Sequence, residues 1–233
     1  MESMPPEHPM TQFFNQIGPK YEEAFAHDEG LHKAVRDLLQ LLPPDALVLD
    51  CGCGTGKPVA TMVAGSGRRV HGIDRSETMV ELSRRQVPSG TFEKADMLQY
   101  CPEDASFSGI IAMLSLFELS RAELVLVADN FHRWLQPGGY LLIGVIGADD
   151  RAKDVKAEMW DADNLFASGI PTTFMSRLEF KNLFTKKGWN ALLEGAGLKV
   201  LSAEVDVFKP PPDAGCDDEP HYFVIAKKYP NHT

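Results

Sequence analysis

The chain has 233 residues, of which 44% are hydrophobic, and it carries a formal net charge of −10 with a pI near 5.2. This length suits one α/β domain with a full hydrophobic core. The acidic balance disfavours nucleic acid as a partner, because phosphate binding requires clustered Lys and Arg. No apolar run approaches the roughly 20 residues of a membrane span, so no membrane association and a cytoplasmic location are expected. The cysteines have no metal-binding spacing, and no metal site is expected.

The N-terminal segment is expected to be helical after a short lead-in. Residues 1–10 are Pro-rich and acidic, and they predict a disordered lead-in. Residues 11–26 carry aromatic side chains at helical spacing with a Gly-Pro break, which predicts two short helices. Residues 30–42 predict a third, amphipathic helix. Residues 11–45 would together form a helical cap.

From residue 47 onward, predicted strands and helices alternate. The expected strands cover residues 47–50, 70–73, 91–95, 107–116 and 140–146, and the helices between them cover residues 58–64, 77–86 and 121–135. The fourth strand segment is apolar throughout, which is typical of a strand buried on both faces. This alternation predicts an α/β fold with a doubly wound, mostly parallel sheet.

The alternation stops after Gly147. Residues 148–190 contain many large apolar side chains, and they are expected to form a helical insertion that covers the substrate. Two late strands, at residues 199–207 and 221–227, follow each other without a helix between them, so they are expected to pair antiparallel. The prediction is one domain over residues 11–233.

The connection between the first strand and the next helix is rich in glycine and runs Asp50-Cys51-Gly52-Cys53-Gly54-Thr55-Gly56-Lys57-Pro58. Glycine lets a ligand approach the backbone closely, and N–H groups at the start of a helix favour an anionic group. A dinucleotide site requires G-x-G-x-x-G/A, and neither frame places Gly or Ala at the last position. The P-loop pattern fails because Pro58 stands where Ser or Thr should follow Gly-Lys. A tight turn without a ligand is the remaining alternative.

The pattern Asp-x-Gly-x-Gly-x-Gly resembles motif I of the class I S-adenosylmethionine-dependent methyltransferases, and the resemblance runs from about Tyr21 to Lys227. It implies a Rossmann-like, seven-stranded sheet that finishes with a reversed edge strand, and S-adenosylmethionine as the cofactor. Asp50 would accept hydrogen bonds in the loop and face the positive end of the cofactor. The other motif residues would approach its amino acid part: Gly52, Cys53, Gly54 and Gly56.

Acidic residues follow the second and third predicted strands. Asp74 stands about 20 residues beyond the glycines, as a ribose-binding acid does; the alternative is a cap for the helix that begins at Glu77. The resemblance places the adenine amino group at Asp96, and a solvent-exposed loop acid is the alternative there. Further cofactor contacts implied by the resemblance are Tyr21, Arg75, Met79, Met97, Leu114 and Ser115.

Methyl transfer requires mainly alignment and the exclusion of water, and it requires a general base only where the acceptor must lose a proton. Glu118, just beyond the fourth strand, is the candidate base; the alternative is an acid that begins the next helix. No histidine forms a recognisable base with an orienting partner. Contacts with the acceptor are expected from Phe117, Phe174 and Met175.

The apolar insertion and the lack of basic patches predict a hydrophobic small-molecule acceptor. They resemble the methyltransferases of secondary metabolism, in which O-methylation is common, and N-, S- or C-methylation stays open. A cofactor-bound protein that catalyses a non-methylating reaction would preserve all of these features. The glycine spacing disfavours a nicotinamide oxidoreductase, and an interaction module would not need acids at three strand ends. Either a monomer or a homodimer is compatible with the sequence.

Overall fold

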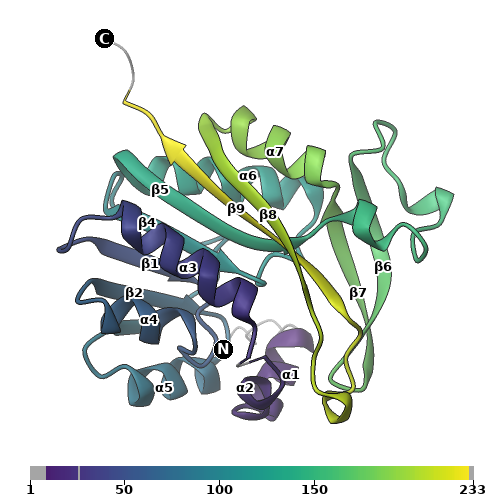
Figure 1. Cartoon of the computed structure of the whole chain (residues 1–233), viewed down its shortest axis with the longest axis horizontal. Helices are drawn as coiled ribbons and strands as arrows, with labels where there is room; N and C mark the ends of the chain where they lie inside the picture. The colour runs from purple at the N-terminus through teal and green to yellow at the C-terminus, as the bar shows by residue number, and fades with distance from the viewer. Residues whose placement is uncertain (1–8, 26, 231–233) are drawn as a thin grey trace, which may run out of the picture.

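A seven-stranded sheet organises the computed structural model, which describes residues 9–25 and 27–230. The strand order is β3-β2-β1-β4-β5-β9-β8 (Figure 1). The strands are β1 (Leu47–Cys51), β2 (Arg69–Asp74), β3 (Thr91–Lys94), β4 (Phe107–Met113), β5 (Leu135–Ile146), β8 (Leu198–Phe208) and β9 (Glu219–Lys228). Strands β1 to β5 pair parallel, and β9 pairs antiparallel with β5 and β8. The doubly wound, mostly parallel sheet and its antiparallel last strand are confirmed.

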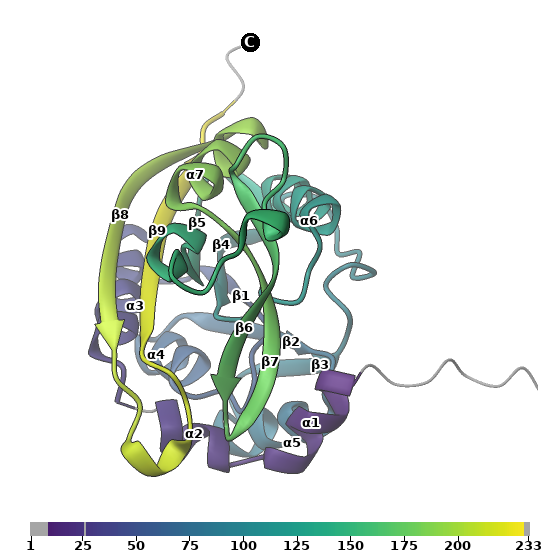
Figure 2. The same cartoon turned by 90° about the vertical axis from the view of Figure 1, so that its right-hand side faces the viewer.

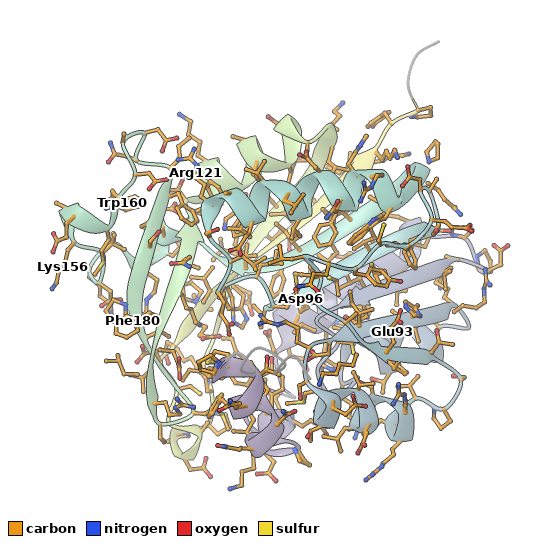
Figure 3. All side chains as sticks on the ribbon, turned by 180° about the vertical axis from the view of Figure 1, so that it is seen from behind. Glu93, Asp96, Arg121, Lys156, Trp160 and Phe180 are labelled. Atoms are coloured by element: carbon orange, nitrogen blue, oxygen red, sulfur yellow. The ribbon has the colours of Figure 1, made fainter. Side chains whose placement is uncertain are left out.

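Helices cover both faces of this sheet. Helices α3 (Glu29–Leu41), α4 (Val59–Gly65) and α5 (Glu77–Gln86) pack on one face, and α6 (Arg121–Trp134) and α7 (Lys186–Gly195) pack on the other. Figure 1 shows α3 in front of the sheet, and Figure 3 shows α6 across the opposite face. Both packed layers bury apolar side chains of β4, whose segment Ile110-Ile111-Ala112 is fully buried. Among the helices of the described residues, none is both long and apolar enough to cross a membrane.

The reversed strand is not at the edge of the sheet. β9 lies between β5 and β8, so β8 forms the edge, and the expected reversed edge strand is wrong in this detail. The central position of β9 follows from its composition, because Tyr222 to Ala226 are all buried, whereas most of β8 is exposed. This placement brings the start of β9 into the interior, where Glu219 and His221 are buried.

The segment after β5 contains strands rather than the expected helical insertion. After two short 3-10 turns, η1 (Ala148–Arg151) and η2 (Ala157–Met159), the strands β6 (Phe166–Phe174) and β7 (Arg177–Phe184) form a separate antiparallel pair. Figure 2 shows this pair running past the end of the main sheet toward the N-terminal helices. The expectation of a helical insertion over residues 148–190 is therefore wrong, although α7 does begin within this range.

The turn between β6 and β7 explains why the sequence pattern does not predict these two strands. Phe174 pairs with Arg177, so the loop has only two residues, Met175 and Ser176. Both have positive φ, at 50° and 62°, as a type I′ turn requires. That turn usually carries Asn-Gly or Asp-Gly, so Met-Ser gives no turn signal in the sequence.

The expected helical cap over residues 11–45 is only partly correct. Helices α1 (Pro9–Ile17) and α2 (Lys20–Phe25), separated at the Gly-Pro break as predicted, form the cap beside the cavity, whereas α3 packs on a face of the main sheet. Residues 1–8 of the expected lead-in lie outside the described residues, whereas Pro9 and Met10 already belong to α1, so the helix begins earlier than expected. The cap joins the β6–β7 pair through aromatic contacts: the ring centroids of Phe13 and Phe174 lie 6.0 Å apart, and those of Phe25 and Phe174 lie 5.6 Å apart.

Candidate active site

A cavity lies where β1, β2, β3 and β4 end at their carboxyl edge, the usual place of ligands in open α/β sheets. Its other walls come from α1, α2, β7 and the start of β9. Every predicted site residue except Gly56 and Met175 lines it. The structure thus brings together Tyr21, Asp50, Gly52, Cys53, Gly54, Asp74, Arg75, Met79, Asp96, Met97, Leu114, Ser115, Phe117, Glu118 and Phe174.

The glycine loop is held against the ends of β2 and β4. The backbone N–H groups of Gly52 and Cys53 both donate to the carbonyl of Ile73, at 2.8 and 3.0 Å. Gly52 has φ of +81°, and a Cβ there would lie 2.4 Å from the Cβ of Ser115. The Ser115 hydroxyl in turn donates to the carbonyl of Cys51 at 2.8 Å. Only glycine permits this contact between the loops after β1 and β4.

The next two glycines of the motif serve different purposes. Gly54 has φ of +52°, and a Cβ there would meet nothing within 4 Å, so its backbone is open to the cavity. Gly56 instead packs on α5, where an added Cβ would lie 3.1 Å from the Ser83 hydroxyl. Gly56 therefore shapes the loop without lining the cavity.

Asp74 ties the glycine loop to the start of α5. One carboxylate oxygen accepts the N–H of Gly54 at 2.9 Å, and the other accepts the N–H of Ser76 at 2.8 Å. Burial raises the pKa of Asp74, and these backbone N–H groups oppose that rise. The alternative of an Asp74 cap is wrong, because Ser76 is the N-cap and its hydroxyl accepts the N–H of Met79. Asp74 is held in place by backbone donors and faces the cavity.

Asp96 and Arg75 lie next to each other in the cavity wall formed by the loops after β3 and β2. The Nε of Arg75 is 3.6 Å from one Asp96 oxygen, and the other oxygen accepts the N–H of Leu98 at 3.0 Å. Figure 3 shows Asp96 near the middle of the molecule, whereas the labelled Glu93 of β3 lies toward its side. Asp96 therefore lines the cavity instead of being an exposed loop acid.

Asp50 is the most unusual group of the site. Its side chain is 1% exposed, and neither carboxylate oxygen has a hydrogen-bond partner within the described part of the chain. Burial, with a smaller contribution from Asp74, raises the pKa of Asp50 to about 8. The expectation that Asp50 accepts hydrogen bonds in the loop is wrong, because the nearby N–H groups of Gly52 and Cys53 turn to Ile73. An unpaired buried carboxylate indicates a place for a positively charged ligand group.

The loop after β4 carries two further features of the site. Leu114 has φ of +54°, a strained value for a leucine, and such strain concentrates at functional sites. Burial raises the pKa of Glu118 to about 7, with opposition from Arg75 and support from Glu179. The alternative of a helix-start acid is wrong, because Ser120 is the N-cap of α6 and Glu123 completes its capping box. Glu118 precedes the cap and lines the cavity.

A buried charge array at the end of the cavity was missed by sequence reasoning. The array consists of Asp28, His221, Glu219 and Lys181, which are 0%, 0%, 2% and 7% exposed. Lys181 and Glu219 line the cavity. The alternation of residues 177–184 would place Lys181 on the polar face with Arg177 and Glu179, whereas in the structure Lys181 is buried and the apolar Leu178 and Phe180 are exposed. No local pattern connects Asp28 with His221, since they are 193 positions apart.

The array is continuous from the cavity to the start of α3. Lys181 Nζ lies 2.6 Å from Glu219 Oε1, His221 Nε2 lies 2.9 Å from Glu219 Oε2, and His221 Nδ1 lies 2.7 Å from Asp28 Oδ2. The second oxygen of Asp28 accepts the N–H of Leu31 and so caps α3. Both ring nitrogens of His221 face carboxylates, which only accept, so the ring is an imidazolium. Accordingly, although burial opposes the charge, Asp28 and Glu219 raise the pKa of His221.

Comparisons with known proteins agree with this geometry. A family model described as "Methyltransferase domain" matches residues 48–139. An O-methyltransferase of Pyrenophora dematioidea is 31% identical over 155 residues, which are 64% of this chain and 56% of that protein. A protein of Talaromyces variabilis, named S-adenosyl-L-methionine-dependent Diels-Alderase iccD, is 31% identical over 203 residues, 80% of this chain and 65% of that protein.

The match to the family model contains the glycine loop, Asp74 and Asp96, which are the residues that carry the resemblance. Residues 48–139 are a methyltransferase domain of the class I S-adenosylmethionine-dependent type. A solved structure with the same fold is the 1,6-didemethyltoxoflavin-N1-methyltransferase of Burkholderia thailandensis, at a TM-score of 0.66 and 19% identity, covering 98% of this chain and 93% of that one. The chain spans about half the length of the first curated relatives it matches.

The residues of the cavity fit the cofactor of the methyltransferase family. The unpartnered Asp50 suits the positively charged amino acid end, and the open backbone at Gly54 allows close approach. Asp74 would receive the ribose hydroxyls, and Asp96 and Met97 would receive the adenine. These individual contacts stay predictions. Within the described residues, no cluster of His, Cys, Asp or Glu is arranged to hold a metal ion.

Proposed function

We propose that this protein transfers the methyl group of S-adenosylmethionine to an oxygen of a hydrophobic small molecule. The single observation that carries this proposal is the continuity of the cavity. Its cofactor end contains Asp50, Gly54, Asp74 and Asp96, and its acceptor end contains aromatic side chains of the cap and of the β6–β7 pair. The aromatic residues at the acceptor end are Phe14, Tyr21, Phe25, Phe117, Phe174 and Phe180.

The acceptor end supports a planar, apolar molecule. Phe174 contacts Phe13, Phe14, Tyr21 and Phe25 with ring centroids between 5.6 and 6.4 Å apart, so the cap and β6 form one aromatic wall. Such walls exclude water and bind flat molecules by offset or edge contacts. Met175 packs outside the cavity against the cluster of Phe25 and Phe208, and its N–H donates to the thiol of Cys216. The predicted acceptor contact of Met175 is therefore not supported, whereas those of Phe117 and Phe174 are.

Glu118 is the residue proposed to accept the proton of the acceptor hydroxyl. A general base acts best when its pKa is near the working pH, and burial brings the pKa of Glu118 to about 7. Its backbone is fixed, because the side-chain amide of Asn182 donates to the Glu118 carbonyl at 3.3 Å. The bound cofactor supplies an electrophilic methyl group, which is already activated, so the protein contributes alignment and proton removal.

The experiment that tests the proposal is a calorimetric titration followed by product analysis. S-Adenosylmethionine and S-adenosylhomocysteine should bind with micromolar affinity, and NADH should not. Mass spectrometry of incubations with a panel of phenols, enols and amines should then detect a methylated product. A folded protein that binds neither adenosyl compound would overturn the proposal, and binding of NADH alone would indicate an oxidoreductase.

A second candidate function has support from one relative. The Talaromyces variabilis protein is named as a Diels-Alderase that depends on S-adenosyl-L-methionine, and its match covers 80% of this chain. A cofactor-dependent rearrangement would use the same cavity with the cofactor unconsumed. Product analysis separates the two functions, because methyl transfer forms S-adenosylhomocysteine in equal amount to product and a rearrangement forms none.

A further inference from the structure

The buried charge array reaches the acceptor end of the cavity through Glu219 and through the ammonium group of Lys181. This group lies 4.5 Å from the centre of the Phe117 ring and 5.9 Å from that of Phe174. Phe117 and Phe174 both line the acceptor end, so Lys181 is the cation between two aromatic walls. Its strand is fixed next to the loop after β4, because the N–H of Asn182 donates to the Phe117 carbonyl at 2.8 Å.

We propose that Lys181 binds the acceptor oxygen and selects acceptors whose hydroxyl ionises readily, namely phenols and enols. The proposal rests on the proposed function, because it names the substrate class of the same site. A cation within about 4–6 Å of a hydroxyl favours its ionised form. The aromatic walls favour a flat ring, and the ammonium between them favours an oxygen that carries negative charge.

The array shares one carboxylate between two cations. Two cations, Lys181 and His221, alternate with two carboxylates, Glu219 and Asp28, so Glu219 is shared between the lysine and the imidazolium. Glu219 itself does not serve as the base. Although burial opposes it, the neighbouring Lys181 and His221 lower the pKa of Glu219 to about 2. A carboxylate that acidic holds a cation and takes up no proton near neutral pH.

Other ionisable groups face the same end of the cavity. Glu118, Glu179 and Tyr21 line it, and Cys216 lies close enough for Lys181 to lower its thiol pKa against the effect of burial. Burial and the charge of Glu219 raise the pKa of Tyr21, so this phenol stays protonated. Arg75 also lines the cavity and acts on Glu118, but it is paired with Asp96 at the cofactor end, so Lys181 is the cation proposed to meet the acceptor oxygen.

The group-transfer step balances with these residues. The acceptor O–H bond breaks and its proton passes to the carboxylate of Glu118, leaving an oxyanion beside the ammonium of Lys181. A lone pair of that oxygen then forms the O–CH₃ bond while the sulfonium C–S bond breaks, and the bonding pair stays on sulfur. Lys181 keeps its proton throughout, so it binds the oxyanion without acting as an acid.

The test measures the ionisation of a bound phenol probe. 7-Hydroxycoumarin is titrated by absorbance from pH 5 to 9 in the presence of saturating protein, with and without S-adenosylhomocysteine, because its phenol and phenolate absorb differently. In the wild type, the ionisation constant of the bound probe should be about tenfold larger than that of the free probe. In Lys181→Met this enhancement should disappear, and in Lys181→Arg, which keeps the cation, it should largely return.

The control and a second variant keep the result interpretable. Lys33→Met removes an exposed lysine whose 2.7 Å contact with Glu204 matches the Lys181–Glu219 contact in length, and it should leave the probe unchanged. If Lys181→Met does not fold, the double variant Lys181→Met/Glu219→Gln removes one charge of each sign and should show the same loss. Failure of the wild type to bind the probe, or equal ionisation in wild type and Lys181→Met, would overturn the proposal.

This experiment separates the two proposals. The titration without cofactor requires no methyl donor, so it reports on Lys181 even if the protein transfers no methyl group. Absence of S-adenosylhomocysteine binding with a normal Lys181 effect would overturn the proposed function alone. Normal cofactor binding with no Lys181 effect would overturn the role of Lys181 alone.

Discussion

At the cofactor end of the cavity, most of the geometry is made by backbone groups of a contiguous loop, whereas at the acceptor end it is made by side chains from distant segments. Gly52 and Gly54 are placed by hydrogen bonds to Ile73 and Asp74 over about one supersecondary unit. Lys181 is placed by Glu219, which lies 38 positions away. Backbone geometry tolerates few substitutions, because only glycine adopts these conformations without strain. The acceptor end can vary by single side chains, so it is where substrate choice belongs.

The largest effect is expected on the catalytic rate, at Glu118, which we place between the cofactor end and the acceptor end of the cavity. Glu118→Gln should lower kcat by about 10²- to 10⁴-fold with cofactor affinity unchanged, because a general base typically contributes that much. In the wild type, kcat/KM should rise with pH through about 7, as Glu118 loses its proton. Steady-state kinetics against pH would check this, with the exposed Glu103→Gln as control. A rate that falls as pH rises through 7 would exclude Glu118 as the base.

A stability measurement sharpens the contrast at the acceptor end. Glu219→Ala removes the shared partner of two buried cations, and it should lower the free energy of unfolding by about 3–5 kcal/mol. In the wild type, the pKa of Glu219 is lowered from its ordinary 4.5 to about 2, so its contribution is present above 4.5 and is lost as pH falls toward 2. The raised pKa of His221 has the opposite sign, and its contribution is lost as pH rises through that value. Urea unfolding at several pH values would check both pH dependences. A free energy of unfolding that does not change with pH would contradict the assignment of charges to Glu219 and His221.

The cofactor end should respond in affinity. Asp74→Ala removes a carboxylate that would bind the ribose hydroxyls and that already accepts the N–H of Gly54. Hydrogen bonds to a charged group contribute about 1.5–3 kcal/mol each, so S-adenosylmethionine should bind about 10- to 100-fold more weakly. Calorimetry would measure this, with Glu77→Ala as control because Glu77 is exposed at the start of α5, just after Asp74. Equal affinity in wild type and Asp74→Ala would remove Asp74 from the cofactor site.

The smallest effect is expected at Asp50, where one substitution should raise the stability of the protein and lower its affinity for the cofactor. Asp50→Asn should stabilise the cofactor-free protein by about 1–3 kcal/mol at pH 9, since it removes an unsatisfied buried carboxylate, and it should weaken cofactor binding. Because the pKa of Asp50 is raised from 3.8 to about 8, wild-type stability should fall as pH rises between these values, and Asp50→Asn should remove that fall. Thermal unfolding with and without S-adenosylhomocysteine would check it. A variant that loses stability would mean that Asp50 has a partner in the folded protein.

The residues of the cofactor end could be assigned to one cavity from the sequence because their signals are local. Strand β1, the glycine loop and Asp74 lie within 30 residues, and each follows from hydrophobic runs, glycine spacing or a terminal acid. Asp50 lines the cavity as predicted. Its lack of hydrogen-bond partners could not be predicted, because it depends on the N–H groups of Gly52 and Cys53 donating to Ile73 instead. The cap alternative at Asp74 failed because Ser76, two residues later, is the better N-cap.

The acceptor end could not be predicted for two physical reasons. The turn at Met175 and Ser176 lacks the residues that normally mark a two-residue hairpin, so β6 and β7 gave no boundary signal. The buried charge array joins Asp28 with the start of β9, and no sequence pattern in either segment indicates that the two lie in contact. Buried Lys and Glu are rare without partners, so the array becomes visible only once the fold has brought the partners together.

Asn182 holds β7 against the loop after β4 and against β6, and this arrangement can be used to engineer the specificity of the protein. Its backbone and side-chain amides donate to the carbonyls of Phe117 and Glu118, and its side-chain oxygen accepts the N–H of Gly169. These bonds fix the register of β7 through one residue, and the residues just before it, Glu179 to Lys181, line the cavity. A library that randomises positions 179 and 180 and keeps Lys181 and Asn182 would therefore diversify the acceptor wall while the buried charge array stays intact. New substrates could be selected in this way without disturbing the glycine loop.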